Sequence, residues 1–124
     1  MEIRVVIADD SAAVRRGLRN LLSRDNEIEI VGEAGDYAHM AKIVVETNPH
    51  VVVMDLNMPN YPDGNVPGLR SFFQPGSEPP IIVISFAIDS EAKQRAVQLG
   101  AKRMLDKTNL ASELIPTIRE LIAP

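Results

Sequence analysis

The chain has 124 residues, 45% of them hydrophobic, and a net charge of -4. This length fits one domain with a full apolar core and leaves no room for a second sizeable domain. The absence of cysteine excludes disulfides, thiolate zinc sites and iron–sulfur clusters, and 13 basic against 17 acidic side chains argue against nucleic-acid binding by bulk charge. Since no apolar run is long enough for a membrane span and no signal peptide is apparent, we expect a cytoplasmic domain.

The first third of the chain predicts a strand, a helix and a second strand. Residues 3–7 form a short buried-strand run, and the apolar residues of 14–22 recur at helical spacing. Ser11 is suited to cap that helix, because its hydroxyl can accept a hydrogen bond from a free backbone N–H. Residues 28–32 then alternate between apolar and polar, which is typical of a half-buried strand.

The middle of the chain contains a second helix, a central strand and an irregular segment. Asp36 can cap a helix that ends at Asn48-Pro49. The run at 51–54 is apolar on both faces, which favours a central strand of a parallel sheet. Residues 57–80 carry six prolines and three glycines, so we expect at most two helical turns there, within 68–74.

The last third predicts two more strands and two helices. Residues 81–86 repeat the buried-strand signature, and Asp89 or Ser90 caps the helix that follows. Gly100 ends that helix, and residues 103–105 form a short fifth strand.

The closing helix contains Pro116. A helix that begins at Asn109 would lose a backbone bond and kink at this proline, whereas one that begins at Ser112 would place it in the first turn. Five strands that alternate with helices predict an α/β fold with a doubly wound five-stranded parallel sheet and right-handed crossovers.

Polar side chains follow four of the predicted strands, namely Asp9, Asp10, Asp55, Ser85 and Lys107. Each alone is an ordinary turn or cap residue, but ligands of doubly wound sheets bind beyond the carboxyl ends of the strands, where these side chains converge. Three carboxylates repel one another unless a cation lies between them, and their hard oxygens suit Mg²⁺. With a lysine and a hydroxyl beside them, the set suggests phosphoryl transfer to a carboxylate.

At these residues the sequence resembles the receiver domain of two-component response regulators, over essentially the whole chain. The motifs that carry the likeness are Val6-Ile7-Ala8-Asp9-Asp10, Val53-Met54-Asp55-Leu56-Asn57-Met58-Pro59, Ile82-Val83-Ile84-Ser85, Gly100-Ala101 and Leu105-Asp106-Lys107. Residues 28–34 and Lys107-Thr108 look closest to the NarL/FixJ type. The resemblance implies a (βα)5 flavodoxin-like receiver fold with strand order 2-1-3-4-5, spanning residues 1–124 with no output domain.

The resemblance also implies roles for the acidic residues. The match to Asp55 accepts a phosphoryl group from the phosphohistidine of a sensor histidine kinase or phosphotransfer protein. The match to Asp10 binds Mg²⁺ directly, and the match to Asp9 usually does so through water. Asp55 and the backbone carbonyl of Asn57 complete the metal site.

Ser85 and Lys107 match the residues that contact the phosphoryl oxygens. Phosphorylation then changes the face formed by the helix after Asp89, the strand at 103–105 and the closing helix. That face signals to an output domain or effector protein, or pairs as a homodimer, and we expect this chain to bind neither nucleic acid nor membrane directly.

Three positions depart from the family pattern. Phe86 stands where relatives carry Ala or Gly, so it either shields the phosphoryl group or ends the fourth strand as a core aromatic; Phe86 and Ala87 are our candidate modulating residues. Met104 stands where relatives often carry an aromatic residue that reports activation. Methionine is flexible and can repack but has no hydroxyl, and Met104 is our candidate switch residue. The insertion around 60–67 predicts either a reshaped loop over the pocket or a tolerated surface insertion.

Two versions of the receiver hypothesis remain open, and the sequence argues against two other functional classes. The chain is either a stand-alone receiver or the receiver of a longer transcription factor. A haloacid-dehalogenase-type phosphatase needs a second aspartate where Asn57 stands, and a cap domain. A flavodoxin-like cofactor binder needs a phosphate-binding loop after the first strand, where Asp9 and Asp10 would repel the phosphate.

Overall fold

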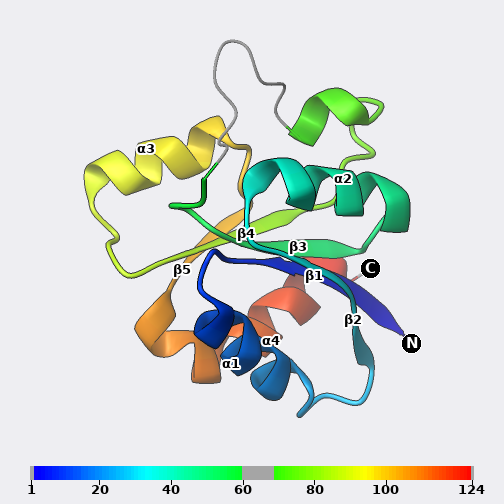
Figure 1. Cartoon of the computed structure of the whole chain (residues 1–124), viewed down its shortest axis with the longest axis vertical. Coiled ribbons are helices and arrows are strands. Elements are labelled where there is room, and N and C mark those ends of the chain that lie inside the picture. Colours follow the sequence, from blue (N-terminus) through cyan, green and yellow to red (C-terminus); the bar gives the residue numbers. More distant parts are fainter. Residues whose placement is uncertain (1, 60–68, 124) are drawn as a thin grey trace.

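A computed structural model of the chain describes residues 2–59 and 69–123. They form a five-stranded parallel sheet in the order β2-β1-β3-β4-β5, with helices on both faces (Figure 1). The expected α/β class and the expected strand order are confirmed. The strands are β1 (Ile3–Ala8), β2 (Ile28–Ala34), β3 (Val51–Asp55), β4 (Ile81–Ser85) and β5 (Arg103–Asp106).

Three of the α-helices begin where a capping side chain supplies an acceptor. The side chains of Ser11, Asp36 and Asp89 accept hydrogen bonds from the backbone N–H three residues on, at 3.2, 2.7 and 2.8 Å. Asp89, rather than Ser90, is therefore the cap of the third helix. The α-helices are α1 (Ala12–Leu22), α2 (Tyr37–Thr47), α3 (Ser90–Gln98) and α4 (Leu110–Ile122), and the short 3-10 helices are η1 (Leu69–Phe72) and η2 (Lys107–Asn109).

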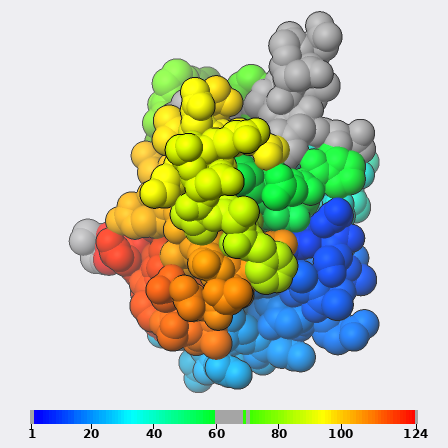
Figure 2. Space-filling view, turned by 90° about the vertical axis from the view of Figure 1, so that its left-hand side faces the viewer, coloured from blue at the N-terminus to red at the C-terminus, as the bar shows by residue number. Residues whose placement is uncertain are grey.

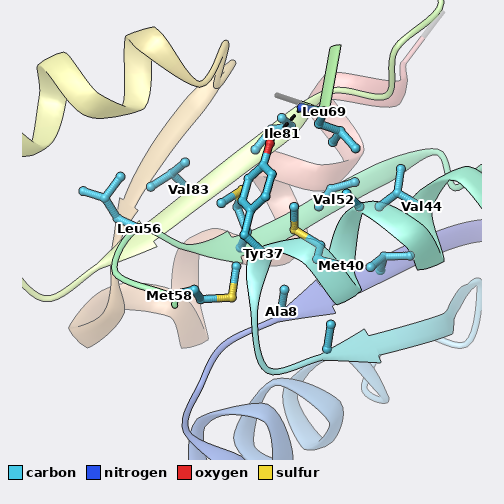
Figure 3. Close-up of a cluster of buried hydrophobic side chains, with 14 of the residues drawn as sticks. Ala8, Tyr37, Met40, Val44, Val52, Leu56, Met58, Leu69, Ile81 and Val83 are labelled. Carbon is cyan, nitrogen blue, oxygen red and sulfur yellow. Dashed lines mark hydrogen bonds between the residues drawn. The ribbon is translucent and has the colours of Figure 1, made fainter. Parts of the chain in front are cut away.

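The sheet separates two apolar cores. Helices α1 and α4 cover one face, and α2 and α3 cover the other (Figure 1). β3 and β4 are buried along their whole length, as their continuous apolar sequence predicts. On the α2 side, Tyr37 lies fully inside the core, and its hydroxyl accepts a hydrogen bond of 2.8 Å from the backbone N–H of Leu69 (Figure 3).

The segment between β3 and β4 contains η1, which lies within residues 68–74, where the prolines and glycines predicted at most two helical turns. The described part of this segment contains no helix longer than η1. The predicted reshaping around Asn60-Tyr61-Pro62 and Pro67 lies outside the described residues. Among the residues that the structure covers, no helix has the length and apolar character needed to cross a membrane.

Pro116 lies inside α4, because the helix already begins at Leu110. The proline has no N–H to donate to the carbonyl of Ser112, so one backbone bond of the helix is lost. The start at Ser112, which would have avoided this loss, is not adopted. The early start buries Leu110 in line with Leu114 and Ile118, and this burial offsets the lost bond.

Candidate functional site

An acidic cluster lies at the carboxyl edge of the sheet, where the neighbouring strands β1 and β3 end. Asp9 and Asp10 follow β1, Asp55 ends β3, and one carboxylate oxygen of each lies within 4.8 Å of the others. Asp9 is 0% exposed and Asp55 is 4% exposed, whereas Asp10 faces solvent. The structure therefore brings together the three carboxylates that the sequence pattern singled out.

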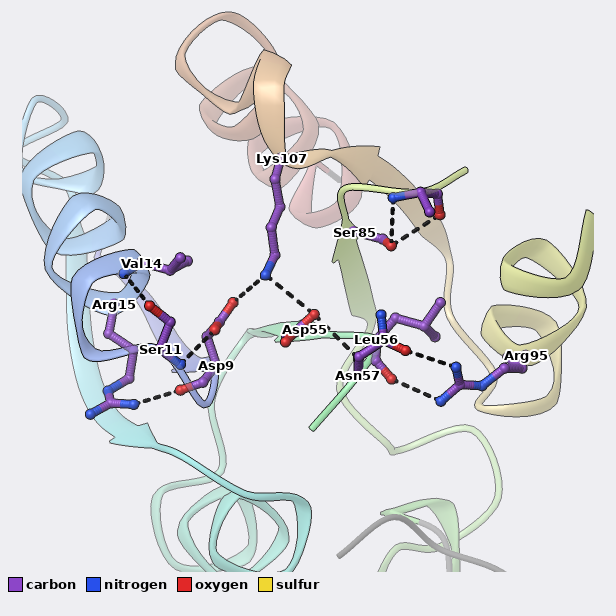
Figure 4. A network of polar contacts seen from close by, with 11 residues as sticks. Asp9, Ser11, Val14, Arg15, Asp55, Leu56, Asn57, Ser85, Arg95 and Lys107 are labelled. Atoms are coloured by element: carbon purple, nitrogen blue, oxygen red, sulfur yellow. Dashed lines mark hydrogen bonds and ion pairs between the residues drawn. The ribbon is translucent and has the colours of Figure 1, made fainter. Parts of the chain in front are cut away.

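Lys107 reaches this cluster from the end of β5. Its side chain is only 8% exposed, and its Nζ lies 2.7 Å from Oδ2 of Asp9 and 3.3 Å from Oδ1 of Asp55 (Figure 4). The long side chain spans the end of β4, which lies between β5 and β3 in the sheet. One ammonium against three carboxylates leaves two negative charges, and this excess matches a divalent cation.

Burial raises the pKa of the Asp55 carboxyl. The backbone N–H of Asn57, which donates to Oδ1 of Asp55 at 3.2 Å, acts in the opposite direction, as does Lys107, while the charge of Asp9 adds to the rise. Ionised Asp55 is therefore costly in this pocket unless further positive charge is present. The donors are all carboxylate oxygens, which are the ligands that Mg²⁺ prefers, so the residues fit that ion.

Two arginines that sequence reasoning did not single out hold the backbone around the cluster. Arg15 of α1 donates to the carbonyl oxygen of Asp9 at 2.5 Å and to Glu33 at 3.0 Å. Arg95 of α3 donates to the side-chain oxygen of Asn57 at 2.8 Å and to the carbonyl of Leu56 at 3.1 Å (Figure 4). Nothing in the local sequence distinguishes either arginine from an ordinary surface position of its helix.

Ser85 ends β4 and is 1% exposed, but its hydroxyl is engaged away from Asp55. It donates to the carbonyl of Ala87 at 3.0 Å and accepts from the N–H of Ala87 at 3.2 Å. Met104 is half-buried one strand away, opposite Val83, and packs against the α2–α3 core. Within residues 2–59 and 69–123 neither side chain is hydrogen-bonded to Asp55, so their roles as phosphoryl-contacting and switch residues stay predictions.

Phe86 projects from the chain after β4 and is 68% exposed, which contradicts its interpretation as a core aromatic. Lys107 Nζ lies 5.1 Å from the centroid of its ring, within the range of a cation–π interaction. The ring therefore stands at the rim of the acidic cluster, above the ammonium group. Figure 2 shows the face on which α3, in yellow, stands out above the chain that leads into α4, in orange.

Comparison with known proteins agrees with this arrangement. The family described as the response regulator receiver domain matches residues 5–119. The transcriptional regulatory protein LiaR of Bacillus subtilis is 36% identical over 117 residues, which cover 94% of this chain and 54% of that protein. A protein-glutamate methylesterase/protein-glutamine glutaminase of Koribacter versatilis is 37% identical over 128 residues, covering 94% of this chain and 34% of that protein. The chain thus spans about half the length of LiaR and about a third of the methylesterase.

Solved structures show the same fold. A LuxR-family two-component response regulator from Aurantimonas superposes with a TM-score of 0.83 at 28% identity, covering 99% of this chain and 86% of that one. The signal receiver domain of the putative response regulator NarL from Mycobacterium tuberculosis superposes with a TM-score of 0.77 at 27% identity, covering 95% and 97%. The likeness to NarL-type receivers, noted at residues 28–34 and Lys107-Thr108, is confirmed.

Proposed function

Because this chain belongs to the response regulator receiver domain family, we propose that it is a phosphoacceptor that takes a phosphoryl group onto Asp55 from a sensor histidine kinase or a phosphotransfer protein. The observation that carries the proposal is the position of Asp55. Its carboxylate lies at the carboxyl edge of the sheet, 3.3 Å from the ammonium of Lys107 and beside Asp9 and Asp10. The domain is a signalling module, and the chemistry it performs is on its own side chain.

In the proposed transfer, a carboxylate oxygen of Asp55 forms a bond to the phosphorus of a phosphohistidine. The bond between phosphorus and the imidazole nitrogen breaks, and its electron pair returns to the imidazole. Lys107 is held beside Asp55 by its ion pair with buried Asp9, so it is in place to offset the charge of the incoming oxygens without reorganisation.

Asp9, Asp10 and Asp55 would hold Mg²⁺, together with the backbone carbonyl of Asn57. When bound, the ion supplies positive charge that offsets the carboxylates and the transferring oxygens. Burial keeps Asp9 in place, and exposed Asp10 gives the ion a route from solvent.

The phosphoryl group adds about two negative charges and three acceptor oxygens. Ser85 would turn from the Ala87 carbonyl to donate to one of those oxygens, and Phe86 would cover the group from the solvent side. The resulting change reaches α3, β5 and α4, whose outer face would contact an output domain, an effector protein or a second copy of the chain. Relatives of similar identity are named as transcriptional regulators and as methylesterases, so we leave the kind of output open and propose that this chain acts through protein contacts.

The proposal is tested by incubating the chain with Mg²⁺ and acetyl phosphate, a small phosphodonor, and measuring acid-labile phosphate by intact mass. The unchanged chain should gain one phosphoryl group, and Asp55→Asn should gain none. Asp89→Asn is the matched control, because it makes the same chemical change at the cap of α3 and asparagine caps helices equally well. Full labelling of Asp55→Asn would contradict the proposal.

A further inference from the structure

Helix α3 has a weak apolar attachment to the sheet. Its buried residues are Ala92 and Ala96, which are the smallest side chains with apolar surface to bury; Leu99 at its C-cap is only partly buried against the same core, and Val97 is 74% exposed. Since burial free energy scales with the apolar area removed from water, two alanines hold a helix far less firmly than leucines do. Other contacts must therefore contribute much of what keeps α3 in place.

Arg95 supplies such a contact. Its guanidinium donates to the Leu56 carbonyl at 3.1 Å and to the Asn57 side chain at 2.8 Å, so one arginine holds two successive residues of the loop after β3. The backbone N–H of Asn57 in turn donates to Asp55 at 3.2 Å. Hydrogen bonds from a charged donor are stronger than neutral ones, and these link α3 to the proposed phosphoacceptor in two steps.

A cavity of about 150 Å³ lies next to this link, between α3 and the ends of β3 and β4. Ser85, Ala87, Asn57 and Arg95 are among the residues that line it. The space gives the chain after β4 somewhere to move. For Ser85 to donate to a phosphoryl group it must leave the Ala87 carbonyl, and that rearrangement shifts the residues that lead into the Asp89 cap of α3.

We propose that Arg95 is a latch that holds α3 against the Leu56–Asn57 loop in the unphosphorylated chain and opposes the helix movement that accompanies phosphorylation. Arg95 is a positioning residue, since it reaches Asp55 through Asn57. The link to signalling depends on the proposed function, but the latch is a property of the unphosphorylated protein. Without it, α3 opens locally more often while the rest of the sheet stays folded.

The test is backbone hydrogen exchange of the unphosphorylated chain, resolved for the amides of α3 and of α4. Arg95→Gln should speed exchange in α3 by about tenfold and leave α4 unchanged, because loss of charge-assisted hydrogen bonds affects the helix that carries them. Arg95→Lys keeps the charge but cannot reproduce the planar fork, so it should give an intermediate rate. Lys93→Gln, an exposed charge removal on the same helix, is the matched control and should match the unchanged chain.

Equal α3 exchange in Arg95→Gln and the unchanged chain would overturn the latch, as would an equal rise in α3 and α4 or a rise of the same size in Lys93→Gln. A second arm adds Mg²⁺ and beryllofluoride, a stable phosphoryl analogue. The unchanged chain should then exchange in α3 as fast as unloaded Arg95→Gln. If Arg95→Gln speeds α3 exchange but beryllofluoride does not, Arg95 holds the helix in place and its part in switching is refuted. Failure of Asp55 to accept a phosphoryl group would refute the proposed function alone.

Discussion

The two helices that flank β5 are attached to the sheet in different ways. Helix α4 inserts Leu110, Leu114 and Ile118 into the core that it shares with α1. Helix α3 inserts two alanines into the opposite core and depends on the polar contacts of Arg95. Polar contacts can be exchanged for others at little net cost, whereas a buried leucine cannot leave the core without losing its burial free energy.

This difference indicates where a signal can move the fold at low cost. The acidic cluster is built on β1 and β3, whose residues are fully buried beside the site, so its geometry is rigid. Helix α3 lies next to that rigid cluster with few buried side chains. A change of charge at Asp55 therefore arises in a tightly packed part of the fold, and it can displace the neighbouring helix α3, which has few buried side chains.

The largest expected effect comes from truncating a buried side chain of α4, the helix with the larger apolar side chains in the core. Leu114→Ala should lower the free energy of unfolding by about 4 kcal/mol, because it leaves a cavity in a fully buried site. Ala96→Gly, the corresponding truncation in α3, should cost only about 1 kcal/mol, mostly through helix propensity. Urea denaturation measures both values, and equal losses would show that α3 and α4 are held alike.

Removing the ammonium group tests the rigid site itself. Lys107→Met should lower the free energy of unfolding by about 2 kcal/mol at neutral pH, because Asp9 and Asp55 are left buried without their cation. Lys102→Met, at an exposed lysine that precedes β5 at the opposite edge of the sheet, is the control and should change stability by less than about 0.5 kcal/mol.

The loss in Lys107→Met should also depend on pH. Burial already raises the pKa of Asp55, and an aspartate with a raised pKa binds its proton more tightly in the folded state. Stability therefore falls as the pH rises from the unfolded value of about 3.9 through the folded pKa. Without Lys107 the pKa of Asp55 should rise further. The difference in free energy of unfolding between the variant and the unchanged chain should therefore narrow as the pH is lowered and Asp55 takes up its proton. A difference that is constant with pH would contradict this electrostatic account.

The smallest expected effect concerns the exposed ring above the site. Phe86→Ala should change the free energy of unfolding by less than about 1 kcal/mol, because the ring is mostly in solvent and the variant removes one exposed cation–π interaction with Lys107. If the ring shields the phosphoryl group, the same variant should shorten the lifetime of the phosphorylated chain a few-fold. Phe72→Ala, a half-exposed phenylalanine of η1, is the control, and equal lifetimes in both variants would remove the shielding role.

The strands, the helix caps and the acidic cluster were predictable because they depend on local pattern and on one rule of topology. Parallel strands end at a common edge, so Asp9, Asp55 and Lys107 had to meet once the strands were assigned. Arg95 was not predictable, since its acceptors lie on a loop 38 and 39 residues earlier and the packing of α3 brings them within reach.

Two further residues show how tertiary context overrides local preference. Pro116 disfavours a helix interior, yet burial of Leu110 extends α4 past it toward the N-terminus. Phe86 follows a fully buried strand, and apolar pattern alone allowed a core position. The turn after Ser85 directs it to the surface instead, where it meets Lys107.

The central claim is that Asp55 accepts the phosphoryl group, and chemical mapping of the modified residue tests it most directly. The chain is phosphorylated with acetyl phosphate and Mg²⁺, reduced with borohydride, which converts an aspartyl phosphate to homoserine, and sequenced by peptide mass spectrometry. We predict homoserine at position 55 and unchanged aspartate at positions 9, 10 and 89. Homoserine at any of those other positions, with Asp55 unmodified, would contradict the account.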